Sequence, residues 1–105
     1  MKGKKITRSV GYVIDWKREE EKLKLGRINA NEAIILSFLP VKWKWIVRER
    51  DGTLLISTSK PEKDRKFWTF SSRSQVIMFP YRNLFKMVSW SDSKPTNIDK
   101  LIRGE

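Results

Sequence analysis

Cationic side chains recur at nearly every second residue in the segment "VKWKWIVRERDGTLLIST", residues 41–58. They are Lys42, Lys44, Arg48 and Arg50. On a β-strand, alternate side chains project from one face at steps of about 6–7 Å, so such a line of cations can follow a phosphate backbone. Trp43 and Trp45 lie between them, and exposed indoles stack on nucleic-acid bases. The segment therefore suggests a surface that binds an anionic polymer.

The Asp51-Gly52 pair in this segment predicts a β-hairpin with a two-residue type I′ turn, which needs positive φ at both central residues. A turn there pairs Arg50 with Thr53 and Trp45 with Thr58. One face of the hairpin then carries Trp43, Trp45, Val47, Leu54 and Ile56. The other face carries Lys42, Lys44, Ile46, Arg48 and Arg50, opposite Thr53, Leu55, Ser57 and Ser59. Two interpretations stay open: a solvated basic face backed by buried tryptophans, or a basic face that contacts an anionic partner.

A second group of candidates follows the hairpin. The run "FWTF", residues 67–70, is typical of a strand in which Trp68 points away from Phe67 and Thr69, so we expect at least one exposed ring. Arg65, Lys66 and Arg73 flank this run. Trp68 and these three cations are therefore candidate contacts to nucleic acid, and the alternative is that the aromatic residues here form the core.

The elements that would position these residues predict an α+β fold. The sequence predicts a frayed basic N-terminal segment at residues 1–8, a short strand at residues 9–14 and a helix in "DWKREEEKLKLG". Asn29 or Asn31 can cap a second segment that Pro40 ends. Its residues 32–39, which are mostly apolar, are a helix or a buried strand, with the caps favouring a helix. Strands follow in the hairpin, in "FWTF", in "QVIMF" and in "NLFKMVSW". Thr96 or Asn97 then caps a short terminal helix, "IDKLIR".

This order of elements predicts N-terminal helical segments packed on an antiparallel sheet of about four or five strands. The 105 residues are enough for one domain with a single core, and we expect residues 1–105 to form it. The formal charge is +11, from 23 Lys and Arg against 12 Asp and Glu. Residues 1–26 carry +4, residues 27–66 carry +4 and residues 67–105 carry +3, so a basic patch must be made by folding.

The composition argues against an enzyme. The chain has no His and no Cys, which removes the commonest general base, the commonest transition-metal ligand and every disulfide. It also has neither a nucleophile elbow nor a Gly-rich phosphate loop. Carboxylates at Asp51, Asp64 and Asp92 would make a Mg²⁺ site only if folding brought them together, and their spacing does not predict that. We therefore expect no catalytic residues, no metal and no cofactor.

Two further classes are disfavoured. No run approaches the roughly 20 apolar residues of a membrane span, and the N-terminus lacks the apolar core of a signal peptide, so we expect a cytoplasmic protein with no membrane partner. The two predicted N-terminal helices and the turn between them have the order and approximate spacing of a helix-turn-helix motif. Its second helix, "EAIILSFL", offers no Arg, Lys or Gln to read a base edge, so we assign that helix to the core.

The C-terminal two thirds contain a series of short motifs: a W-x-W strand, a D-G hairpin, "SKP", "FW" and then "NLFKMVSWSDSKPTNI". Residues 41–98 thereby resemble small proteins encoded by phages and prophages. The resemblance implies a small accessory product of a mobile element that works by binding in the bacterial cytoplasm.

Three functions fit these observations. The first is binding of nucleic acid through the basic face, which the charge favours. The second is inhibition or modulation of a host or defence protein whose surface is acidic. The third is self-association in an assembly.

Overall fold

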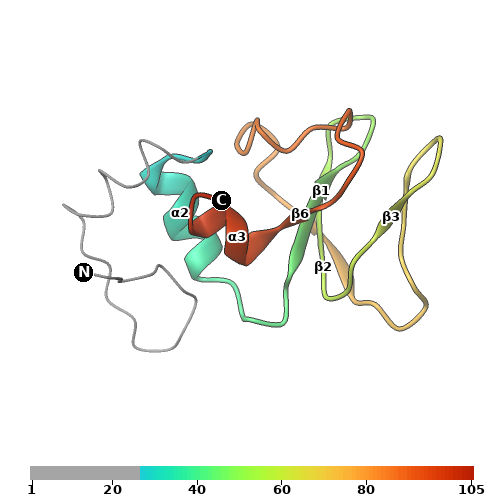
Figure 1. Ribbon diagram of the computed structural model, residues 1–105, viewed down its shortest axis with the longest axis horizontal. Coiled ribbons are helices and arrows are strands. Elements are labelled where there is room, and N and C mark those ends of the chain that lie inside the picture. Colours follow the sequence, from blue (N-terminus) through green and yellow to red (C-terminus); the bar gives the residue numbers. More distant parts are fainter. Residues whose placement is uncertain (1–26) are drawn as a thin grey trace.

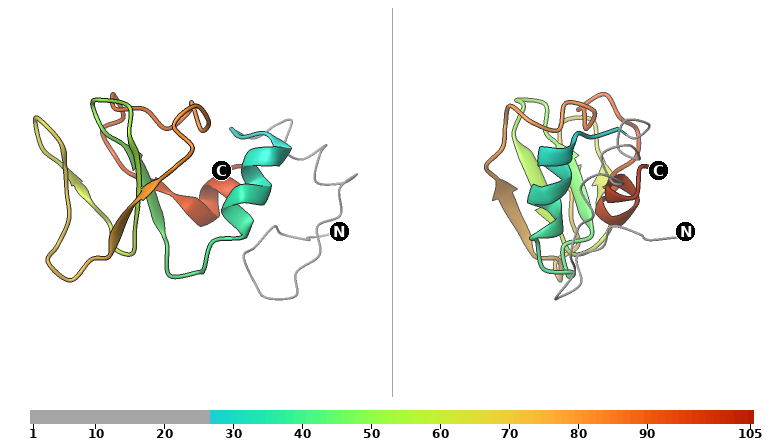
Figure 2. Two further views of the ribbon diagram at one scale, coloured as in Figure 1. Left: turned by 180° about the vertical axis from the view of Figure 1, so that it is seen from behind. Right: turned by 90° about the vertical axis from the view of Figure 1, so that its left-hand side faces the viewer.

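The computed structural model describes residues 27–105, and these form three layers (Figure 1). Helices α2 (Ala30–Ser37) and α3 (Ile98–Ile102) lie on one face of a four-stranded antiparallel sheet. A separate pair of short strands, β3 (Glu62–Lys63) and β4 (Trp68–Thr69), lies on the other side. The views from behind and from the side show the helices together against the sheet (Figure 2). The expected elements at 1–8, 9–14 and 15–26 lie outside the described residues.

Helix α2 forms because its first turn is capped from both directions. The Asn29 side chain accepts the backbone N–H of Glu32 at 2.8 Å, and the Glu32 carboxylate accepts the backbone N–H of Asn29 at 3.0 Å. This capping box satisfies two backbone donors that a helix leaves unpaired. The helical interpretation of residues 32–39 is therefore confirmed, with Asn29 as the cap.

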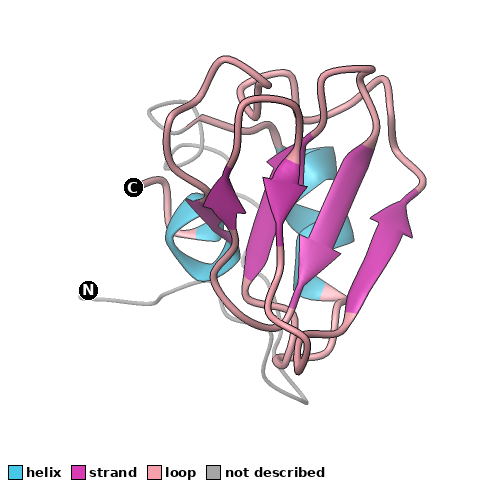
Figure 3. Cartoon of the chain, turned by 90° about the vertical axis from the view of Figure 1, so that its right-hand side faces the viewer, coloured by secondary structure: helices cyan, strands magenta, loops and turns pink. Residues whose placement is uncertain are grey.

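The sheet has the strand order β5-β2-β1-β6. Its strands are β5 (Val76–Phe79), β2 (Leu54–Ser57), β1 (Trp45–Arg48) and β6 (Thr96–Asn97). Figure 3 shows these strands with the helices behind them. The edge strands β5 and β6 come from segments far apart in the chain, and only β1 and β2 form a hairpin with each other.

The register predicted for that hairpin is wrong by one residue. Glu49 donates its N–H to Thr53 at 2.7 Å, Gly52 donates to Glu49 at 2.9 Å, and Gly52 has φ +95°. The loop thus has three residues, a turn followed by a left-handed glycine, instead of the two of a type I′ turn. Consequently Ile46 pairs with Ile56 and Arg48 pairs with Leu54. Since side chains alternate, the face expected to be a basic strip is the face that meets the core.

The main core lies between the helices and this face of the sheet. Leu36 from α2, Ile46 and Ile56 from the hairpin, and Leu101 from α3 are fully buried. Trp43, which precedes β1, also joins this core. On the opposite face of the sheet Val47 is buried, and Trp68, Pro61 and Ser57 are buried outside the main cluster.

The strand predicted at "NLFKMVSW" is also wrong. Residues 81–92 form successive turns, with hydrogen bonds from Leu84 to Tyr81, from Val88 to Phe85 and from Asp92 to Ser89. Phe85 is fully buried with φ +58°, a left-handed conformation that interrupts an extended chain. Its N–H donates to the Glu32 carboxylate at 2.6 Å, which ties these turns to α2.

The short terminal helix is confirmed, and the Asn97 side chain caps it by accepting the N–H of Lys100 at 3.0 Å. The α+β class is confirmed as well, with helices on a four-stranded antiparallel sheet. Within residues 27–105, no helix is long and apolar enough to cross a membrane.

Candidate functional site

Arg48, one of the cations of the predicted strip, uses its hydrogen-bond donors within the protein. Its guanidinium donates to five backbone carbonyls at 2.7–3.0 Å. The acceptors are Gly52, Arg82, Leu84, Phe85 and Val88. Desolvation by burial, and then the charge of Arg82, lower the pKa of Arg48 below its ordinary value. A guanidinium has five N–H donors, so Arg48 has none left for a phosphate.

Trp68 is only 3% exposed and offers no face for a base. Its indole N–H donates to the carbonyl of Arg48 at 3.1 Å, and its backbone N–H donates to the Glu49 carboxylate at 3.1 Å. The ammonium of Lys63 lies 5.4 Å from the Trp68 ring centroid. Trp68 therefore belongs to the packing between the two sheets, and the exposed ring of "FWTF" is Phe67, at 50%.

The other predicted cations are exposed but lie in two groups at opposite ends of the sheet. Arg50 is in the β1–β2 turn, and Arg65 and Lys66 are in the β3–β4 turn at the same end. Lys42 and Lys44 precede β1, and Arg73 precedes β5. Because β1 and β5 both begin at the end opposite the β1–β2 turn, these three lie away from the first group. These six cations therefore do not form a single line on the surface.

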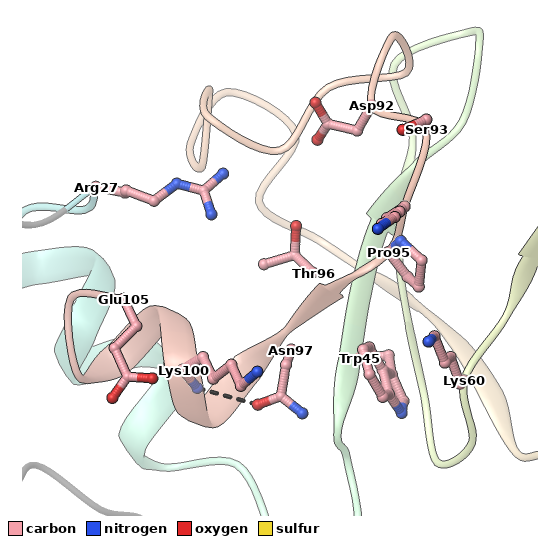
Figure 4. A pocket seen from close by; sticks show the side chains of 11 residues that line it. Arg27, Trp45, Lys60, Asp92, Ser93, Pro95, Thr96, Asn97, Lys100 and Glu105 are labelled. Atoms are coloured by element: carbon pink, nitrogen blue, oxygen red, sulfur yellow. Dashed lines mark hydrogen bonds between the residues drawn. The ribbon is translucent and has the colours of Figure 1, made fainter.

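A cavity of about 480 Å³ opens beside the edge strand β6 (Figure 4). Its wall includes the half-buried indole of Trp45. Trp45 points away from the main core because its neighbour Ile46 faces that core. Thr96 and Asn97 of β6 line the cavity beside it. We call this site the Trp45 pocket.

The Trp45 pocket is electropositive. Four exposed cations line it, namely Arg27, Lys60, Lys94 and Lys100. Among the described residues, the Lys94 and Lys100 ammonium groups make no ion pair or side-chain hydrogen bond. The Lys60 ammonium lies 5.7 Å from the Trp45 ring centroid. Four cations and one indole on the wall of the same pocket suit an anion that also has a planar group.

Two carboxylates also line the pocket, and both are engaged within the protein. The Asp92 carboxylate accepts the N–H of Ser89 at 3.0 Å. The Glu105 carboxylate accepts the Nε–H of Arg103 at 2.9 Å. The pocket thus keeps an excess of positive charge.

The sequence does contain a signal for this pocket, although it is separate from the hairpin cations on which the prediction was based. The tripeptide Ser-Lys-Pro occurs at residues 59–61 and again at residues 93–95. Each places a lysine on the wall of the pocket, since Lys60 and Lys94 both line it. A proline holds the preceding residue in extended conformation, which fixes where each lysine leaves the backbone. None of the cations predicted to bind lines the pocket, and neither does Trp68.

The three carboxylates considered for a metal do not converge. In residues 27–105 no group of three or more His, Cys, Asp or Glu side chains is placed to hold a metal ion. Comparison with known proteins adds nothing to these observations, because no family model, no curated protein and no solved structure matches the chain.

Proposed function

We propose that this protein binds single-stranded nucleic acid at the Trp45 pocket. The observation that carries the proposal is the half-buried indole of Trp45 in a cavity whose walls bear four cations from three segments of the chain. In this arrangement a base stacks on Trp45, and the adjoining phosphates contact Lys60, Lys94 and Lys100. The accessory role implied by the resemblance to phage and prophage proteins accords with this activity.

The recessed indole favours a single strand over a duplex. A cavity of about 480 Å³ is of the size that holds a small molecule, and an unpaired base fits such a space. A base within a duplex is stacked on both sides and would have to leave the helix to reach Trp45, at a cost of a few kcal/mol. Single-stranded ligands avoid that cost.

Lys60 competes with a base for the face of Trp45, and the energies of the two interactions indicate which of them occupies the ring. A cation–π contact at an exposed site contributes about 0.5–1 kcal/mol. Stacking of a base on an aromatic side chain contributes about 1–3 kcal/mol. A base therefore displaces the Lys60 ammonium from the ring, and the ammonium is then available to a phosphate.

The proposal is tested by fluorescence anisotropy with a labelled oligothymidylate at low salt. Trp45→Ala should weaken binding about tenfold or more, because stacking contributes about 1–3 kcal/mol. Trp45→Phe keeps an aromatic face and should retain most of the affinity. Equal affinity of Trp45→Ala and the unmodified protein would exclude stacking on Trp45.

A charge-matched pair of variants separates the Trp45 pocket from general attraction by a basic protein. Lys60→Gln/Lys94→Gln and Arg65→Gln/Lys66→Gln each remove two positive charges, the first in the pocket and the second at the β3–β4 turn. The first should lower affinity severalfold more than the second. Equal losses, or equal competition by polyglutamate and oligothymidylate, would mean a nonspecific anion surface.

A further inference from the structure

Asn97 is the neighbour of Trp45 across the sheet, where the two residues are paired in the antiparallel ladder of β1 and β6. Ile98 donates its N–H to the carbonyl of Lys44 at 2.8 Å, which makes those two residues a hydrogen-bonded pair. Pairs alternate along such a ladder, so the adjacent pair, Trp45 and Asn97, is a non-hydrogen-bonded one, in which side chains on the same face lie closest together. The edge of a base that lies on the indole therefore comes within reach of the Asn97 side chain.

The Asn97 amide is fixed in one orientation. Its Oδ1 accepts the backbone N–H of Lys100 at 3.0 Å, which caps α3. The Nδ2 atom is then on the other side of the amide, and Figure 4 shows it on the side of Trp45. Among the described residues, neither N–H of this amide has an acceptor. An amide turned the other way would lose the cap, so the side chain presents donors next to the indole.

The rest of the pocket wall supplies more donors than acceptors. The four cations that line it can only donate. Its two carboxylates, those of Asp92 and Glu105, already accept hydrogen bonds within the protein. Neither residue is paired with Trp45 in the ladder. A carbonyl oxygen of a base next to the indole therefore finds a donor, whereas an exocyclic amino group there meets another donor.

We propose that Asn97 makes the Trp45 pocket selective for bases that carry a carbonyl where others carry an exocyclic amino group. Uracil, thymine and guanine are then bound in preference to cytosine and adenine. The selectivity rests on the proposed function, because it concerns the base that stacks on Trp45. Asn97 Nδ2 donates to the carbonyl oxygen of uracil or thymine, and the amino group that cytosine has in its place turns two hydrogens towards the same donors.

Oligodeoxyuridylate and oligodeoxycytidylate of equal length form a matched pair of probes. Uracil and cytosine have the same ring and differ only in the carbonyl or amino group and in the adjacent ring nitrogen. Anisotropy titrations of the full chain at low salt and neutral pH compare the two. The unmodified protein should bind the uridylate about threefold to tenfold more tightly, which is the range expected from one neutral hydrogen bond.

Three variants show whether Asn97 is the cause. Asn97→Asp keeps an oxygen that caps α3 but replaces the donors by a second acceptor, so it should reverse the preference to cytosine. Asn97→Ser keeps a cap and lacks the amide, so it should bind the two probes within about twofold of each other. Asn83→Asp makes the same change of charge at an exposed position outside the pocket and should keep the original preference. Since Asp and Ser both cap helices well, thermal unfolding of the Asn97 variants should be close to that of the unmodified protein.

The possible failures are distinguishable. Equal binding of the two probes by the unmodified protein, with Trp45→Ala still weakening both, would overturn the selectivity and leave the stacking intact. A preference for the uridylate that persists in Asn97→Ser and Asn97→Asp would also overturn it, because another group would then be responsible. Binding of neither probe would refute the proposed function and with it the role of Asn97.

Discussion

At the scale of single residues, Arg48 shows how one cation is used for structure. Its guanidinium joins the hairpin turn to the carbonyls of the segment 82–88, so a part of the chain without regular secondary structure is fixed around one charge. Lysine at this position has three donors and no planar fork, so it satisfies fewer of these carbonyls.

Arg48→Lys should therefore lower the free energy of unfolding by about 2–3 kcal/mol, because hydrogen bonds to a charged group contribute about 1.5–3 kcal/mol each and leaving partly buried carbonyls unpaired is costly. Urea denaturation measures this loss. Arg50→Lys, two residues away on the exposed turn, is the matched control and should change stability by less than about 0.5 kcal/mol. Equal effects of the two substitutions would contradict the role of Arg48.

Asp51 gives the hairpin turn a dependence on pH. Its pKa is lowered from the ordinary value of 3.8, first by a hydrogen bond from the backbone N–H of Thr53 and then by one from the Thr53 side chain. The folded state thus binds this proton more weakly than the unfolded state. The resulting stability is fully present above the unfolded value of 3.8 and is lost as pH falls through the lower folded pKa.

Asp51→Asn keeps an oxygen that accepts the Thr53 N–H but removes the charge. This substitution should flatten the acid side of the stability profile and change stability less near neutral pH. Thermal unfolding measured over a series of pH values below neutrality tests this expectation. An unchanged acid profile in the variant would show that Asp51 does not contribute to it.

At the scale of elements, local signals predicted the helices and failed for the hairpin register. Asn29 with Glu32, and Asn97 before Ile98, cap their helices through contacts that span only three residues. The hairpin depends on whether Asp51-Gly52 closes a loop of two residues or three, and both loops favour glycine. A difference of one residue exchanges the faces, and for this reason Arg48, predicted on an exposed basic face, lies half-buried on the face that meets the core.

Helix α2 is joined to the turns of residues 81–92 by one buried side chain. Glu32 is 5% exposed, and its two oxygens accept the N–H groups of Asn29 and Phe85. Glu32→Ala should lower the free energy of unfolding by about 2–4 kcal/mol, because it removes half of a capping box and a buried hydrogen bond to a charged group. Asn31→Ala, at an exposed position of the same helix, should be nearly neutral. Chemical denaturation of the two variants tests the difference, and a neutral Glu32→Ala would contradict this account of α2.

At the scale of the whole molecule, the Trp45 pocket could not be predicted from spacing. Its walls come from Arg27, Trp45, Lys60, the segment 92–100 and Glu105, and the pairing of β6 with β1 brings the segment 92–100 beside Trp45. The even distribution of charge along the sequence implies only that any basic patch must be made by folding. It did not indicate which of the 23 cations would gather.

The pocket also predicts how strongly salt should weaken binding. Three lysines that neutralise phosphates of a single strand give a slope of about −2 in a plot of log affinity against log salt, at about −0.7 per phosphate. Lys60→Gln/Lys94→Gln should reduce that slope to about −0.7. Anisotropy titrations at several salt concentrations measure both slopes, and an unchanged slope in the variant would mean that other cations hold the strand.

Photocrosslinking tests whether a base stacks on Trp45. An oligonucleotide that carries 5-iodouridine is irradiated in complex with the full chain, and the crosslinked residue is located by mass spectrometry. The crosslink should map to Trp45. A crosslink confined to Phe67, which is the exposed ring beside Arg65 and Lys66, would contradict it.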